Sequence, residues 1–264
     1  MKRIMTIALI LLVAVSCKKK IKAPENTREF QIESSYASAT YDIKIALPEN
    51  YDPQNKKYAT IYLLDGKDNF KFVAHHCKEI SEKKSTENVM VVSIGYGRDR
   101  ALDYTPTKVK SGSGGAPEFM QFLMNELKPL LESEYAADTT RRSRVILGHS
   151  FGGLFGAFAF TKHNNFFGNY LMLSPSLWWD NEVLLQYEQD DRSIISNKDQ
   201  LVFLGIGKLE NSGRMQAPFE AFYQRMSKYY SSMKLEKNSV AGMEHMGSKN
   251  PNIIKALEFY FQNR

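Results

Sequence analysis

The sequence contains only two cysteines in 264 residues, Cys17 and Cys77, and has no apolar run long enough to span a bilayer. Its longest apolar run, Ile4–Val15, covers about 12 residues, whereas a transmembrane helix needs about 20. The small number of cysteines excludes a fold stapled by several disulfides. A hydrophobic content of 43% is instead sufficient for a sizeable core, on which the fold must rest.

The N-terminus has the features of a secretory signal. Two basic residues, Lys2-Arg3, precede the apolar run, and Ser16-Cys17 follows it. Because Ala14-Val15-Ser16-Cys17 resembles a lipobox, we predict a lipoprotein signal peptide over 1–17, with Cys17 lipidated. This predicts a bacterial cell-envelope protein, lipid-anchored at the periplasmic face or the outer membrane, and leaves Cys77 without a disulfide partner. The alternative is ordinary signal cleavage with Cys17 as a bystander.

The rest of the chain carries no excess of positive or negative charge. Six of the 35 basic residues precede the first acidic residue, Glu25, which leaves 29 residues of each sign after it. The basic pI therefore belongs to the leader and to a polar tether over 18–27, where the lysines favour contact with anionic lipid headgroups. It gives no reason to expect nucleic-acid binding.

Strand-like and helix-like segments alternate over the domain predicted at 28–264. The predicted strands are 29–36, 40–47, 58–64, 89–94, 144–147, 170–173, 201–206 and 235–240. The predicted helices are 70–83, 117–135, 151–162, 181–189, 217–233 and 251–261. This alternation predicts an α/β fold with a mainly parallel sheet covered by helices on both faces. Functional residues are expected in the loops at the carboxyl ends of the strands.

The segment Gly148-His149-Ser150-Phe151-Gly152-Gly153 fits the pattern G-x-S-x-G between a predicted strand and a predicted helix. This pattern is typical of a sharp turn that raises a serine hydroxyl above the edge of the sheet. The glycines keep Cβ atoms away from the neighbouring strand and helix. We therefore predict that Ser150 is a nucleophile.

A serine hydroxyl needs a base to take its proton. Where such a turn carries the nucleophile, an acid and then a histidine follow it along the chain. His245 lies between the last strand and the last helix, whereas His163 is expected at the exposed end of a helix. Glu210 follows the penultimate strand and is the predicted acid that orients His245; Glu244 and Asp180 are weaker alternatives.

A tetrahedral intermediate needs two backbone N–H donors for its oxyanion. One is expected at the residue after the nucleophile, Phe151, and the other at the end of the first buried strand. The second donor is predicted at Gly66 or Lys67, between which the sequence does not decide.

Several segments resemble the family of α/β-hydrolases that includes esterase D and the catecholate-siderophore esterases. The matching segments are Tyr62–Gly66, Arg100–Pro106, Gly148–Leu154 and Ser174–Trp179, so that the resemblance runs along nearly the whole domain. It implies an α/β-hydrolase fold and a serine carboxylic-ester hydrolase that works through an acyl-enzyme on a small-molecule ester. No cofactor is implied.

The same resemblance implies a substrate cleft. Arg100 and Tyr104 would lie in it, with the long loop Arg98–Gly115 shaping its entrance; the alternative for Arg100 is a salt bridge with Asp103. Trp178 and Trp179 would form an aromatic wall of the cleft or, alternatively, cover the edge of the sheet.

Two departures leave parts of the interpretation open. Met246 stands where siderophore esterases tend to have glycine, and some relatives work with a Ser–His pair alone, so the role of Glu210 is open. The alternatives to an esterase are an acyltransferase with the same site and a non-catalytic binding module. No metal is expected, because three consecutive residues of a helix, His75-His76-Cys77, cannot all face one ion.

Overall fold

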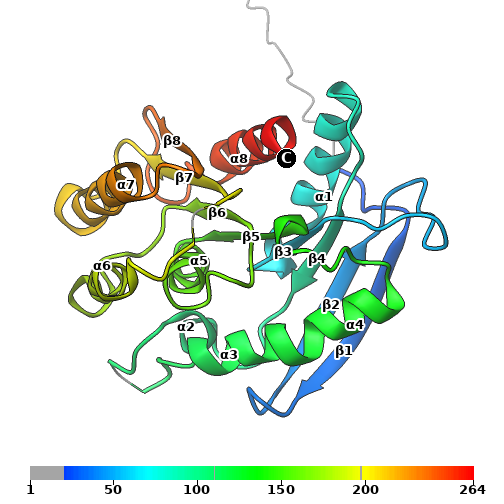
Figure 1. The fold of residues 1–264 in the computed structure, drawn as a ribbon, viewed down its shortest axis with the longest axis horizontal. Coiled ribbons are helices and arrows are strands. Elements are labelled where there is room, and N and C mark those ends of the chain that lie inside the picture. Colours follow the sequence, from blue (N-terminus) through cyan, green and yellow to red (C-terminus); the bar gives the residue numbers. More distant parts are fainter. Residues whose placement is uncertain (1–20, 110, 197) are drawn as a thin grey trace, which may run out of the picture.

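The central feature of the molecule is an eight-stranded sheet (Figure 1). The computed structural model describes residues 21–109, 111–196 and 198–264. The predicted signal peptide, including Cys17, and the first residues of the tether lie outside the described residues. Within the described ranges, no helix is both long enough and apolar enough to cross a membrane.

The strands follow the order β1-β2-β4-β3-β5-β6-β7-β8 across the sheet. They are β1 (Thr27–Ser34), β2 (Ala39–Ala46), β3 (Thr60–Leu63), β4 (Met90–Ile94), β5 (Arg144–His149), β6 (Asn169–Leu173), β7 (Leu201–Gly207) and β8 (Lys234–Val240). The hairpin β1–β2 joins β4 in antiparallel pairing, and all pairs from β4 to β8 are parallel. The prediction of a mainly parallel sheet is therefore confirmed.

Helices cover both faces of this sheet. They are α1 (Gly66–Lys83), α2 (Arg100–Tyr104), α3 (Ala116–Phe122), α4 (Lys128–Glu134), α5 (Phe151–Lys162), α6 (Trp179–Asp191), α7 (Ala217–Tyr229) and α8 (Lys249–Asn263). The apolar sides of α1 and α8 pack on one face, and those of α3 to α7 pack on the other (Figure 1). The central strands β3 to β7 are buried on both faces, which explains their continuous apolar sequences.

The helix predicted over 117–135 is interrupted. The structure has α3, then a π-helical turn over Leu123–Leu127, then α4. Pro129 in the first turn of α4 has no N–H to donate to the carbonyl four residues earlier. A wider turn at this point lets the helix axis continue despite the missing hydrogen bond.

The helix predicted from Asn181 also differs. α6 spans Trp179–Asp191, but Asp180, Asn181 and Glu182 have φ values of 45°, 50° and 63°, so the regular helix starts only at Val183. The segment after β6 thus makes a left-handed turn before it becomes helical.

Candidate active site

Ser150 occupies the sharp turn between β5 and α5. Its backbone has φ 61° and ψ −116°, a conformation rarely adopted by residues other than glycine. A Cβ atom at Gly148 would lie 2.4 Å from the backbone of Gly152, so glycine is required for the helix to approach the strand. The Ser150 N–H donates to the Leu173 carbonyl at 2.9 Å, which ties the turn to the end of β6. The predicted turn is therefore present.

The Ser150 hydroxyl is half-buried and lies 3.3 Å from the Ser176 hydroxyl. The Ser176 N–H also donates to the Ser150 carbonyl at 3.1 Å. Among the described residues, Ser150 Oγ has no hydrogen bond to His245. Bonds between a nucleophile and its base are often long before substrate binds, so this geometry does not argue against the pair. Ser176 is a neighbour that the sequence had not indicated.

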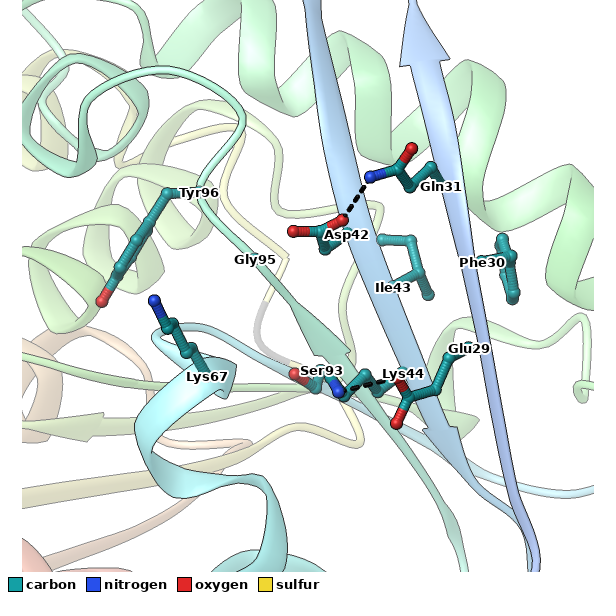
Figure 2. Close-up of a pocket in the computed structure, with 10 residues that line it drawn as sticks. All are labelled: Glu29, Phe30, Gln31, Asp42, Ile43, Lys44, Lys67, Ser93, Gly95 and Tyr96. Carbon is teal, nitrogen blue, oxygen red and sulfur yellow. Dashed lines mark hydrogen bonds and ion pairs between the residues drawn. The ribbon is translucent and has the colours of Figure 1, made fainter.

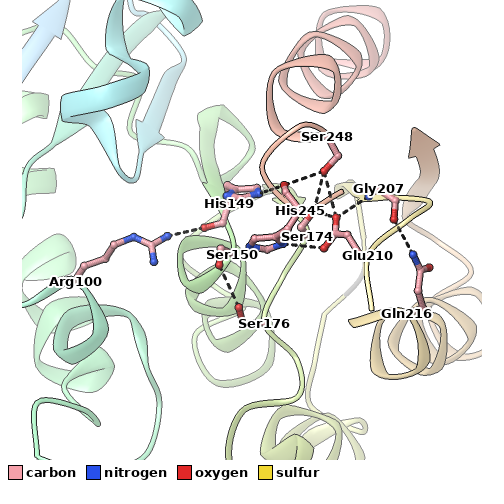
Figure 3. Close-up of polar contacts among 10 residues, drawn as sticks. All are labelled: Arg100, His149, Ser150, Ser174, Ser176, Gly207, Glu210, Gln216, His245 and Ser248. Atoms are coloured by element: carbon pink, nitrogen blue, oxygen red, sulfur yellow. Dashed lines mark hydrogen bonds and ion pairs between the residues drawn. The ribbon is translucent and has the colours of Figure 1, made fainter. Parts of the chain in front are cut away.

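His245 and Glu210 are hydrogen-bonded, with 2.8 Å between His245 Nδ1 and Glu210 Oε2 (Figure 3). His245 lies between β8 and α8, and Glu210 follows β7, as the sequence predicted. No such contact joins the ring to Glu244 or Asp180 among the described residues. The structure therefore brings together the histidine and the acid that the sequence favoured.

The Glu210 carboxylate is fully buried and held from several sides. Its Oε1 accepts hydrogen bonds from Ser174 Oγ at 2.6 Å and from the Gly207 N–H at 2.7 Å. Burial opposes its ionisation, but the hydrogen bonds from His245, Ser174 and Gly207 outweigh burial and lower the pKa of Glu210 below its usual value. The geometry thus favours an ionised carboxylate with one oxygen facing His245.

His149 is a buried histidine beside this pair. Its ring centroid lies 4.6 Å from that of His245, and its Nε2 lies 3.0 Å from the His245 carbonyl oxygen. Burial and the neighbouring His245 lower the pKa of His149 to about 4, so the ring is neutral near pH 7. Sequence reasoning missed this residue because it occupies a variable position of the G-x-S-x-G pattern.

On the other side of Ser150, Arg100 forms a bidentate ion pair with Asp65. The two nitrogen–oxygen distances are 2.5 and 2.8 Å, and Arg100 also donates to the His149 carbonyl at 3.0 Å. The alternative of a salt bridge between Arg100 and Asp103 is wrong, because Asp103 pairs with Arg98 at 2.7 Å. Arg100 is instead held at the carboxyl end of β3, next to the predicted nucleophile.

The predicted oxyanion donors lie at the first turns of two helices. Phe151 begins α5, and Gly66 and Lys67 begin α1. The first N–H groups of a helix have no partner within it and are available to an anion. The preceding amide, that of Asp65, donates to the Tyr104 hydroxyl at 3.2 Å and is therefore occupied. The choice between Gly66 and Lys67 stays a prediction.

Two of the predicted substrate contacts are corrected by burial. Tyr104 is 1% exposed, and its ring packs against Phe119 and Phe155, so it supports the Asp65 turn from the core instead of facing a cleft. Trp179 is 4% exposed and donates its indole N–H to Thr107 at 3.0 Å, which fastens the long loop.

Trp178 is the partly exposed member of the tryptophan pair. Its ring lies 6.2 Å from that of Phe151, and the Arg214 guanidinium lies 3.7 Å from its ring centre. The aromatic wall stays a prediction for Trp178, whereas Trp179 is buried and holds the long loop through Thr107.

Comparison with known proteins shows the family. A family model described as "Putative esterase" matches residues 34–246. The chain belongs to this esterase family. The prediction that the chain is a serine esterase is confirmed at the level of the family.

Curated relatives of this esterase include enzymes named for siderophores. The present chain is 30% identical over 189 residues to the siderophore enterobactin esterase of Emericella nidulans, and the match covers 62% of each chain. It is 28% identical over 221 residues to the ferri-bacillibactin esterase BesA of Bacillus subtilis, covering 74% of this chain and 75% of BesA. The esterase therefore spans less than two thirds of the first relative and about three quarters of the second.

Solved structures confirm the α/β-hydrolase fold. The BES protein from Bacillus cereus superposes with a TM-score of 0.80 at 26% identity, over 92% of this chain and 97% of that one. An IroE-like serine hydrolase from Shewanella oneidensis gives a TM-score of 0.77 at 25% identity, over 90% of this chain and 80% of that one.

A groove of about 560 Å³ adjoins the Asp65 side of the site (Figure 2). Lys67 and Tyr96 line one part of it, and the exposed face of the β1–β2 hairpin lines another. The Tyr96 hydroxyl donates to Asp65 Oδ1 at 2.9 Å, which links the groove to the Arg100 ion pair. Neither Ser150 nor His245 lines it, so the groove is a neighbour of the candidate active site and not part of that site.

The described residues that could hold a metal ion lie on α1. Ligand atoms of His75, His76 and Glu79 lie within 4.8 Å of one another, whereas Cys77 is buried in the core, as expected if the three consecutive side chains diverge. The Glu79 carboxylate lies 3.3 Å from His75 and 3.2 Å from His76, distances that ion-paired side chains of one helix face also adopt. This cluster lies about 13 Å along the helix from Gly66, at 1.5 Å per residue, and we give it no part in the site.

Proposed function

We propose that this esterase hydrolyses carboxylic esters through an acyl-enzyme formed on Ser150. The observation that carries the proposal is the hydrogen bond between His245 and the buried Glu210, placed beside the turn that holds Ser150. A carboxylate on Nδ1 fixes the imidazole tautomer, which leaves Nε2 free to accept a proton.

In the proposed reaction, Ser150 Oγ attacks the ester carbonyl and its proton passes to His245 Nε2. The amides of Phe151 and of Gly66 or Lys67 stabilise the oxyanion. The intermediate collapses to acyl-Ser150, and the leaving alcohol takes the proton from His245. Water then attacks the acyl-enzyme with His245 as base, and the acid is released as Ser150 regains its proton.

We further propose that the substrate lies between Arg100 and Trp178. Arg100 is 30% exposed at the site, and its charge suits an anionic or strongly polar substituent. The names of the curated relatives make siderophore esters the first class to test.

The decisive experiment compares the wild-type protein with Ser150→Ala. We expect turnover of a simple aryl ester to fall at least roughly 10³-fold in the variant, because covalent catalysis is lost. The substrate panel should contain aryl, feruloyl, thioester and siderophore esters, with product analysis in the presence and absence of an added alcohol. Equal turnover in the variant would refute the proposal, whereas transfer to the alcohol in place of water would assign an acyltransferase.

The N-terminal prediction remains a separate proposal. We propose that Cys17 is lipidated and anchors the protein in the cell envelope. Mass spectrometry of the membrane-extracted protein should find the lipid on Cys17, and Cys17→Ser should release the protein to the soluble fraction. An unmodified Cys17 would contradict the proposal and leave the esterase assignment untouched.

A further inference from the structure

The predicted base of this enzyme lies on an exposed loop. Met243 and Met246, on either side of His245, are 40% and 65% exposed, and the His245 side chain itself is 35% exposed. Such a loop has little buried surface to hold it in place. Because proton transfer needs the imidazole within hydrogen-bond reach of Ser150, specific contacts must fix it.

One of these contacts comes from His149. The His245 carbonyl oxygen can only accept, so the His149 nitrogen 3.0 Å away, Nε2, must carry the hydrogen and donate it. The ring of His149 is buried and lies against that of His245, with 4.6 Å between their centroids. His149 thus holds both the main chain and the side chain of His245.

The other donor near this carbonyl has a competing acceptor. Ser248 Oγ lies 3.1 Å from the His245 carbonyl oxygen and 3.2 Å from Glu210 Oε1. A hydroxyl has one hydrogen, so Ser248 cannot donate to both acceptors. When it donates to Glu210, the His245 carbonyl depends on His149 alone.

His149 is itself firmly placed. It is the last residue of β5 and directly precedes Ser150, and its own carbonyl accepts the hydrogen bond from Arg100 (Figure 3). It therefore joins the Arg100 side of the site to the His245 side. A movement of the His245 loop relative to Ser150 would break the His149 contact.

We infer that His149 is a positioning residue, which fixes His245 relative to Ser150 by donating its Nε2–H to the His245 carbonyl. The inference rests on the proposed function. The His149 ring is neutral near pH 7, because burial and then the neighbouring His245 lower its pKa to about 4. Of the other charged groups nearby, Lys249 lowers this pKa and Glu210 raises it. A neutral ring does not repel His245 when that side chain carries the proton.

Two variants separate the hydrogen bond from the packing. His149→Phe keeps a ring of similar shape but removes the donor, and we expect kcat to fall roughly 10- to 100-fold with KM nearly unchanged. His149→Gln keeps an N–H near the position of Nε2 and should recover most of this loss. If His149→Phe does not fold, His149→Ala is measured with the same expectation.

Inactivation by diisopropyl fluorophosphate gives a second readout that does not depend on ester binding. Its rate reports the attack of Ser150 with the help of His245 and should fall in parallel with kcat in His149→Phe. The matched control is His163→Phe, at the end of α5, which removes a half-buried histidine away from the site and should keep wild-type kcat.

Wild-type kcat in folded His149→Phe would overturn the inference. So would equal losses in His149→Phe and His149→Gln, because the effect would then follow packing and not the donor. These results are distinct from failure of the proposed function, for which Ser150→Ala would stay active.

Discussion

The two sides of Ser150 each hold a buried carboxylate, but the partners of these carboxylates differ in kind. Glu210 binds His245, which can take up and release a proton, whereas Asp65 binds Arg100, which stays charged. Glu210 has one oxygen tied by Ser174 and Gly207, so the other is left for the imidazole. Both oxygens of Asp65 are occupied by Arg100. The Glu210–His245 side can therefore transfer a proton, whereas the Asp65–Arg100 side can only fix the position of a positive charge.

The same difference distinguishes two roles of acidic residues that a sequence motif alone does not distinguish. An acidic residue next to a loop can serve acid–base chemistry or can fix a cation for substrate binding. In this esterase the histidine partner distinguishes Glu210, and the bidentate arginine distinguishes Asp65. Exchanging each carboxylate for its amide therefore tests the comparison directly.

The largest effect is expected for Glu210→Gln. An amide at this position can offer an N–H to His245 Nδ1 and so favours the wrong tautomer, which should lower kcat by about 10² to 10⁴-fold with little change in KM. Steady-state kinetics on an aryl ester measure the effect. Glu244→Gln, an exposed neighbour of His245, is the control and should keep wild-type kcat. A loss below about threefold in Glu210→Gln would indicate that a Ser–His pair works alone.

A smaller effect, of a different kind, is expected for Asp65→Asn. Loss of the bidentate pair frees Arg100 and should lower kcat/KM by about 10- to 100-fold, with much of the change in KM. Asp68→Asn, an exposed residue in the same first turn of α1, is the control. If Asp65→Asn changed kcat alone, the two sides of the site would not differ as proposed.

The free energy of unfolding should depend on pH through His149, the buried, neutral residue that joins the two sides. Its pKa falls from 6.5 to about 4 on folding, so between these values the unfolded chain binds a proton that the folded protein does not. The contribution of His149 to the free energy of unfolding is therefore fully present above about pH 6.5 and is lost as the pH falls toward 4, by about 3 kcal/mol in total. The pH dependence of the free energy of unfolding, measured by denaturant unfolding across this range, should be flatter in His149→Gln than in the wild type. An unchanged slope in His149→Gln would contradict the assignment.

The smallest effect is expected for Trp178→Ala. Removing this partly exposed wall should raise KM for an aryl ester roughly two- to fivefold, with a smaller change for a short aliphatic ester. The ratio of the two KM values is the measurement. An equal change for both substrates would show that Trp178 supports the fold near Phe151 and does not form a wall of the cleft.

Much of the architecture could be predicted because it depends on neighbours in the chain. Continuous apolar segments predicted the buried strands, and the glycines around Ser150 predicted the sharp turn between β5 and α5. The π-helical turn was missed, since the helical pattern of apolar residues continues through it and only the missing N–H of Pro129 disturbs the backbone.

The sequence by itself determined the order of the strands and of the longer helices, and the order of Ser150, Glu210 and His245, because hydrophobic period and turn residues act locally. The short helix α2 lies in a segment that was predicted to be a loop. Only the tertiary structure decided which side chains meet. Asp65 pairs with Arg100 across 35 residues and His149 with His245 across 96. Such pairs form because parallel strands bring their carboxyl ends to one edge of the sheet, where through-space distance, and not distance along the chain, selects the partner.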